Sequence, residues 1–231
     1  MLRQYLEIKE QYPGTILFYR MGDFYEMFFE DAETASRVLG ITLTSRNKGE
    51  ENQVPMCGVP YHAVSGYLGK MVKAGYRVAI CEQAEDPKEA KGIVKREVVR
   101  VVTPGVTTDD QILDEKSNTF VCALFVERKG RDILAMGLSF LDISTGNFLL
   151  SEIPLQAGNL DPVIDEITRM QPAELLLTEE ESEHLVEFTE TLAILLPGLC
   201  ITPRDGSAFV QEIARTTLTE HFQVSNLAGF G

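Results

Sequence analysis

The chain has 231 residues, of which 44% are hydrophobic and 24% charged, and this composition predicts a folded protein with room for two modest domains. No apolar run approaches the roughly 20 residues of a membrane-spanning helix, and no charged start followed by an apolar stretch indicates a secretory signal. We therefore expect a cytoplasmic protein without a membrane partner. The formal net charge of −14 argues against the chain as a whole binding a polyanion.

The charge is unevenly distributed along the sequence. Residues 1–110 carry 14 Lys and Arg against 16 Asp and Glu, a balance of −2, whereas residues 111–231 carry 7 against 19, a balance of −12. This asymmetry predicts two domains with different partners. Only the first, near-neutral half could readily approach a polyanion.

The first elements along the chain are a helix and a strand. Residues 3–11 carry apolar side chains at helical spacing and end at the breaker Tyr12-Pro13-Gly14. Residues 15–20 are rich in β-branched and aromatic side chains, which favours a strand.

The next segment, residues 23–29, allows two interpretations. In a helix start, Asp23 is the N-cap and Glu26 completes a capping box, so that Glu26 has only a structural role. In a continued strand, the period of two places Phe24, Glu26 and Phe28 on one face. We prefer the strand, with the helix beginning at Glu30.

The remaining elements of the first half follow from caps, breakers and apolar patterns. We expect a helix at 30–39 ended by Gly40, a strand at 41–44, a polar loop at 45–53, a helix capped by Ser65 and ended by Gly75, a strand at 76–81, a short helix at 87–91 and a strand at 97–102. The polar run 107–117 is the predicted boundary. The predicted domains are therefore residues 1–115 and 116–231.

The second half begins with three strand-like runs at 119–127, 133–142 and 147–152, joined as a hairpin meander. Helix and strand then alternate, with helices at 162–170, 180–191 and 207–222 and strands at 174–178 and 200–202. This is the element order of a ribonuclease H-like sheet. The predicted fold class is mixed α/β in both domains.

Signatures of catalysis and of cofactor binding are absent from the sequence. It contains no phosphate loop, no G-x-G-x-x-G, no G-x-S-x-G and no H-E-x-x-H. Cys57, Cys81, Cys122 and Cys200 are scattered, without a C-x-x-C pair or a neighbouring histidine, so buried thiols rather than a zinc site are predicted. We expect no enzyme, no cofactor and no metal in this chain.

One feature suggests an enzyme nevertheless. Asp142 lies beside a Ser-Thr-Gly turn, and nucleases of ribonuclease H architecture use a strand Asp to bind metal ions. Two-metal chemistry needs several converging carboxylates, for which Glu174 and Asp205 are available. The alternative function is a metal-dependent, structure-selective nuclease, and the simpler interpretation is that Asp142 caps the turn.

Several ordered segments closely resemble the MutS family of DNA mismatch-recognition proteins. In the first half these are residues 18–28 (FYRMGDFYEMF), 56–63 (MCGVPYHA), 78–83 (VAICEQ) and 98–105 (VVRVVTPG). Residues 142–146 (DISTG) and 172–176 (PAELL) resemble the connector domain of the same family. The resemblance spans essentially the whole chain and implies a mismatch-recognition domain followed by a connector domain.

The resemblance also implies which residues contact DNA. In the family, the Phe of a Phe-x-Glu motif enters the minor groove and stacks on a mispaired base, and the Glu hydrogen-bonds the edge of that base. Here these residues are Phe24 and Glu26. By position, four further residues match those that flank or support the DNA, namely Met21, Arg46, Met56 and Arg96. The negative potential of the phosphates should raise the pKa of Glu26 and favour a protonated form that donates to a base acceptor.

Further expectations concern partners. The resemblance implies mismatched duplex DNA and, through the connector, a MutL-type repair protein. It implies a homodimer for the full-length protein in the bacterial cytoplasm, associated with the nucleoid. ATP and Mg²⁺ would bind in C-terminal regions, which together with the lever and clamp regions would lie beyond this chain.

Overall fold

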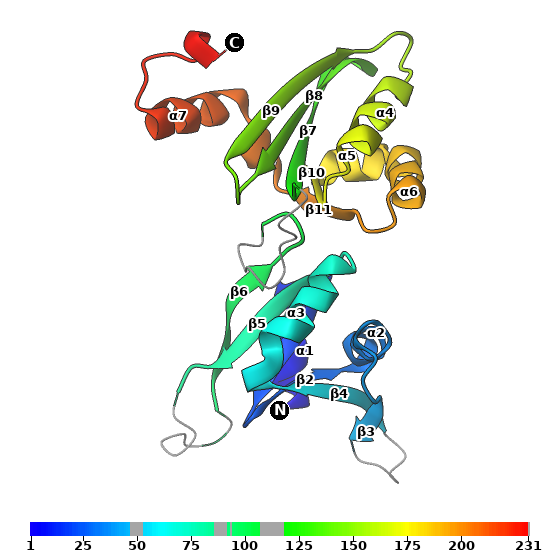
Figure 1. The fold of residues 1–231 in the computed structure, drawn as a ribbon, viewed down its shortest axis with the longest axis vertical. Coiled ribbons are helices and arrows are strands. Elements are labelled where there is room, and N and C mark those ends of the chain that lie inside the picture. Colours follow the sequence, from blue (N-terminus) through cyan, green and yellow to red (C-terminus); the bar gives the residue numbers. More distant parts are fainter. Residues whose placement is uncertain (47–52, 86–91, 93, 107–117, 231) are drawn as a thin grey trace. The chain divides into compact units, whose positions relative to one another are not determined.

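The computed structural model describes residues 1–46, 53–85, 92, 94–106 and 118–230. The chain divides into two compact units, Met1–Thr119 and Phe120–Gly231 (Figure 1). Each unit is built on a mixed sheet with helices, which confirms the predicted fold class. The predicted boundary between residues 115 and 116 lies outside the described residues.

The first unit contains a six-stranded sheet in the order β3-β4-β2-β1-β5-β6. The β1–β5 pair is parallel, and the other neighbouring pairs are antiparallel. The strands are β1 (Thr15–Met21), β2 (Phe24–Phe28), β3 (Thr44–Arg46), β4 (Val54–Pro60), β5 (Arg77–Gln83) and β6 (Arg96–Val102). The helices are α1 (Leu2–Gln11), α2 (Phe29–Leu39) and α3 (Val64–Lys73), with the 3₁₀ turn η1 (Tyr61–Ala63) before α3.

Helices cover both faces of this sheet. α2 and α3 lie over one face and enclose an apolar core with it. α1 lies over the other face, where Tyr5 packs edge-on against Tyr19 and Phe28 (Figure 1). Because side chains alternate along a strand, β2 places Phe24, Glu26 and Phe28 on the α1 face.

The structure decides between the two interpretations of residues 23–29. Residues Phe24–Phe28 form a strand, and α2 begins only at Phe29 with Phe28 as its N-cap residue. The preferred strand is therefore confirmed, and the capping box is wrong. As predicted, α2 ends at Gly40, which adopts the left-handed conformation with φ of 67°.

Three local predictions in this unit need correction. The strand expected at 41–44 is instead Thr44–Arg46, because pairing with β4 rather than local propensity defines it. The strand β4 was not predicted. Ser65 is not the N-cap of α3, because η1 leads into this helix and Ala63 is the N-cap residue. The helix expected at 87–91 lies outside the described residues.

The second unit contains a five-stranded sheet in the order β11-β10-β7-β8-β9. β7, β8 and β9 form the predicted antiparallel meander, and β10 is parallel to both β7 and β11. This arrangement agrees with the element order predicted for a ribonuclease H-like domain. The strands are β7 (Phe120–Lys129), β8 (Asp132–Asp142), β9 (Asn147–Pro154), β10 (Glu174–Thr178) and β11 (Cys200–Arg204).

The helices of this unit differ in how many of their side chains are buried. α4 (Asp161–Met170) and α6 (Val186–Leu195) bury apolar side chains against one sheet face, whereas α7 (Gln211–Phe222) has no buried side chain. The single helix expected at 180–191 is divided at Leu185 into α5 (Glu179–His184) and α6. The start of the helix expected at 207–222 is the 3₁₀ turn η2 (Gly206–Phe209), and a last turn, η3, spans Ala228–Phe230.

All four cysteines are buried free thiols, as predicted. No helix within the described ranges combines the length and hydropathy that crossing a membrane requires.

Candidate nucleic-acid interface

The exposure of side chains on the α1 face rises along β2 from its end to its start. Phe28 is fully buried, Glu26 is half-buried and Phe24 is 47% exposed. β2 therefore presents an aromatic ring to solvent beside a carboxylate that solvent reaches only in part. The structure therefore shows the alternation of side chains that the sequence predicted for this strand.

Glu26 carries a charge in an unfavourable place. Its side chain is 20% exposed, its Oε2 atom is buried, and no described residue donates a hydrogen bond to that atom. Arg46 Nη1 lies 3.7 Å from Oε2, which is an ion-pair distance but too long for a hydrogen bond. Burial raises the pKa of Glu26 above its ordinary value, and the positive charges of Arg46 and Arg96 oppose this shift without cancelling it.

Gly58 of β4 lies directly opposite Glu26 and was not singled out by the sequence analysis. A Cβ atom at this position would stand 3.3 Å from the Tyr25 carbonyl oxygen and 3.6 Å from Glu26 Cγ. The missing side chain therefore leaves one flank of Glu26 open. A signal was present in the sequence, since Gly58 lies inside the family-like segment 56–63.

Met21 and Arg96 lie next to Phe24 on the same face. Met21 is the strand partner of Phe24, and Arg96 Nη2 lies 3.3 Å from its sulfur. Arg96 itself is only 8% exposed, donates from Nε to the Arg20 carbonyl at 2.8 Å and stacks over the Tyr19 ring at 4.8 Å. Arg96 thus holds the end of β1 in place from within the α1 face.

Arg46 and Met56 complete the predicted set. Arg46 comes from β3 and its side chain is 38% exposed, so it can turn toward a ligand. Met56 is the strand partner of Phe28, is half-buried and packs against the core beneath α1. The structure places all six predicted residues on one face of the sheet, with Phe24 the most open of them.

The opposite side of β2 is held by a polar network that the sequence analysis missed. The Tyr25 hydroxyl donates to Glu82, and Arg20 Nη1 lies 4.0 Å from Glu82 Oε2. The Arg20 guanidinium also stacks on Tyr61 at 3.8 Å. Burial, reinforced by the Glu82 carboxylate, raises the pKa of Tyr25 to about 12. These contacts tie β2 to β1, β5 and η1 behind the exposed Phe24.

The carboxylates of the alternative nuclease do not converge. Asp142 Oδ1 accepts hydrogen bonds from Ser144 and Thr145 within its turn, which is the simpler role foreseen for it. The strand register places Glu174 on the same face as Val121 and therefore opposite to Asp142. Exposed Asp205 caps η2. No group of three possible metal ligands occurs among the described residues, and this arrangement gives the nuclease no support.

Comparisons with known proteins agree with the segments that carried the resemblance. The model of MutS domain I matches residues 1–111, and that of MutS domain II matches residues 119–231. The chain belongs to the MutS family. Over its whole length it is 49% identical to the DNA mismatch repair protein MutS of Desulfatibacillum aliphaticivorans, 47% to that of Syntrophobacter fumaroxidans and 42% to that of Chlorobium phaeobacteroides. It covers 25%, 25% and 26% of these relatives, so it spans about a quarter of their length.

Proposed function

We propose that this chain recognises mispaired or unpaired bases in duplex DNA at the start of mismatch repair. The observation that supports the proposal most is the pairing of an exposed Phe24 with a half-buried Glu26 on one face of β2. Phe24 enters the minor groove as a wedge and stacks on a base, which kinks the duplex. A mispair is unstacked at a lower free-energy cost than a matched pair, so the protein binds the DNA where the duplex is easiest to deform.

Glu26 reads the displaced base in this proposal. Burial already favours its protonated form, and the phosphates of bound DNA add to that preference. A protonated carboxyl donates a hydrogen bond to a base acceptor such as N7. An ionised one would be repelled by the backbone, so Glu26 also discourages binding where no such acceptor is presented.

The second domain serves protein contacts. Its −12 charge balance makes direct binding to DNA unfavourable, and a MutL-type repair protein is the partner proposed for it. In the full-length protein we propose a homodimer whose remaining regions bind ATP and Mg²⁺. We propose that the full-length protein acts in the bacterial cytoplasm, on nucleoid DNA.

The test is a titration of the full-length protein with homoduplex DNA and with the same duplex carrying one mispair. Tighter binding to the mispair is expected, and equal affinity would overturn the proposal. A parallel incubation with Mg²⁺ or Mn²⁺ examines the alternative function. Cleavage that is lost in Asp142→Ala would make the chain a nuclease.

A further inference from the structure

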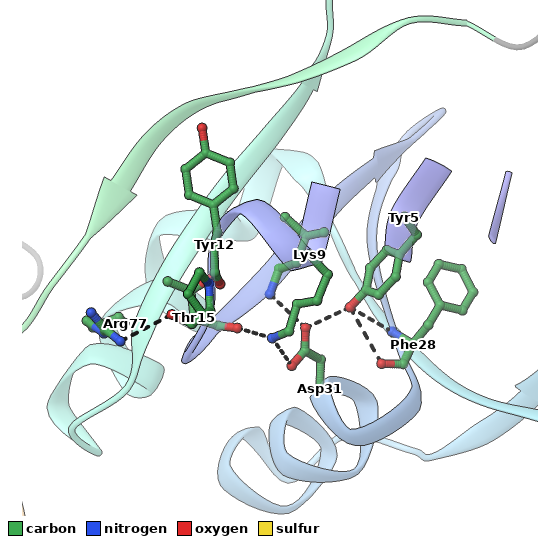
Figure 2. A network of polar contacts seen from close by, with 9 residues as sticks. Tyr5, Lys9, Tyr12, Thr15, Phe28, Asp31 and Arg77 are labelled. Atoms are coloured by element: carbon green, nitrogen blue, oxygen red, sulfur yellow. Dashed lines mark hydrogen bonds and ion pairs between the residues drawn. The ribbon is translucent and has the colours of Figure 1, made fainter. Parts of the chain in front are cut away.

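A buried polar network lies at the end of β2, two residues from Glu26 (Figure 2). Its centre is the Asp31 carboxylate of α2, which is 5% exposed. Asp31 Oδ2 accepts from the Tyr5 hydroxyl at 2.7 Å, and Oδ1 accepts from Lys9 Nζ at 2.7 Å. Tyr5 and Lys9 both come from α1, so the network joins the helices on the two faces of the sheet.

Asp31 also completes the hydrogen bonding of β1. Strand β2 pairs with β1 only over Tyr19–Met21, so the hydrogen-bonded ladder between the two strands stops before Leu17. The Leu17 N–H donates instead to Asp31 Oδ2 at 3.0 Å. A buried N–H needs such a partner, so the carboxylate replaces the missing ladder acceptor. The spacing between β1 and the start of α2 is thereby fixed.

The same network holds a strained corner between β2 and α2. Phe29 has a φ of 54°, a conformation that residues other than glycine and asparagine rarely adopt. Such a residue persists only when its surroundings hold it in place. The Tyr5 hydroxyl lies 3.4 Å from the Phe28 amide nitrogen and 3.5 Å from its carbonyl oxygen, directly beside that corner.

We propose that Tyr5 and Asp31 are positioning residues that fix the angle at which β2 presents Phe24 and Glu26 to DNA. This inference rests on the function proposed above. β2 has five residues, and its far end carries Phe24. Because β2 pairs with β4 along its whole length, a shift of Phe28 at the corner carries the rest of the strand with it, including Glu26 and Phe24.

Tyr5 is the member of the network that can be changed without removing a charge. Lys9 and Asp31 form a largely buried ion pair, and removing one partner leaves the other charge uncompensated. Tyr5→Phe removes only the hydroxyl and keeps the ring that packs on Phe28. Burial and the Asp31 carboxylate raise the pKa of Tyr5, so it remains a neutral donor throughout the working range of pH.

The experiment compares Tyr5→Phe with Ser36→Ala in the full-length protein. Ser36 donates a hydroxyl hydrogen bond to the Ile41 carbonyl at the opposite end of α2, so both variants lose a hydrogen-bonding hydroxyl in the same domain. The readout is the ratio of affinities for single-mispair and matched duplexes, with thermal melts alongside. We expect at least a threefold fall in the ratio for Tyr5→Phe and none for Ser36→Ala, at similar losses of melting temperature.

Two outcomes would overturn the positioning role, and a third would overturn the proposed function. An unchanged ratio in Tyr5→Phe, with a discriminating wild type, overturns the positioning role and leaves the proposed function standing. Equal falls in both variants show a general loss of stability and overturn it as well. A wild-type protein that does not discriminate shows that the proposed function itself has failed.

Discussion

Arg46 Nη1 lies 3.7 Å from Glu26 Oε2, so the two charges attract each other across a gap that no hydrogen bond closes. Burial outweighs this attraction and keeps the pKa of Glu26 above its ordinary value. In the free protein, ionisation of Glu26 therefore costs more than it does in water. DNA phosphates that draw Arg46 away would raise that cost further and promote protonation.

Glu26→Gln should raise the melting temperature of the free protein at pH 7. Because the pKa of Glu26 is raised in the folded state, its contribution to stability is present below the ordinary pKa of about 4.5 and is lost as the pH rises through the folded-state value. The advantage of the neutral amide should shrink as the pH falls toward 4. Thermal melts between pH 4 and pH 8 check this, and an advantage that grows on acidification would contradict it.

The same substitution should weaken discrimination in the full-length protein. Gln always offers an N–H donor and is not repelled by phosphates, so binding to matched DNA strengthens. We expect the mismatch preference to fall by about 1–3 kcal/mol, the range for one specific base contact. Titrations with matched and mispaired duplexes measure it. A lower melting temperature with an unchanged affinity ratio would show that Glu26 has only a structural role.

Gly58→Val should impair the site from the neighbouring strand. The new Cβ would stand in tight contact with the Tyr25 carbonyl oxygen, at 3.3 Å, and in ordinary contact with Glu26 Cγ, at 3.6 Å, so the methyl groups of valine would crowd the open flank of Glu26. We expect a several-fold loss of mismatch preference and a stability loss of about 1 kcal/mol. The control is Gly66→Ala in α3, where the new Cβ would meet open space. Replacing a glycine within a helix by alanine should stabilise the fold, and DNA binding should not change. Equal effects of the two variants on discrimination would count against an open flank at Gly58.

The sequence predicted the shared face of Phe24 and Glu26 better than the sheet that carries them. Alternation alone placed Phe24 and Glu26 on one face, because the period of a strand is a local property. β4 was missed because Pro55 and Pro60 cannot donate to a ladder and argue against a strand. The structure accommodates both: Pro60 ends β4, and Pro55 lies opposite Ser45 in the short pair with β3.

Contacts between distant segments were beyond local patterns. The approach of Arg46 to Glu26 depends on the register of β3, β4 and β2, and the burial of Arg96 depends on β6 lying beside β5. The sequence gives no sign that Lys9 and Asp31 meet, and only the fold brings Lys9 Nζ to within 2.7 Å of Asp31 Oδ1. Such tertiary contacts decide which of the predicted residues are exposed and which are buried beneath them.

Phe24 acts as an exposed wedge in the proposed function, and the affinity ratio of Phe24→Ala for mispaired and matched duplexes in the full-length protein tests this role most directly. Because Phe24 is 47% exposed, the variant should keep a near wild-type melting temperature while losing about 1–3 kcal/mol of base stacking, so that the ratio falls toward one. Phe28→Ala on the same face is the contrast, since Phe28 is fully buried and its truncation should cost about 3–5 kcal/mol of stability. A Phe24→Ala protein that still discriminates, or that unfolds as Phe28→Ala does, would contradict the wedge role of Phe24.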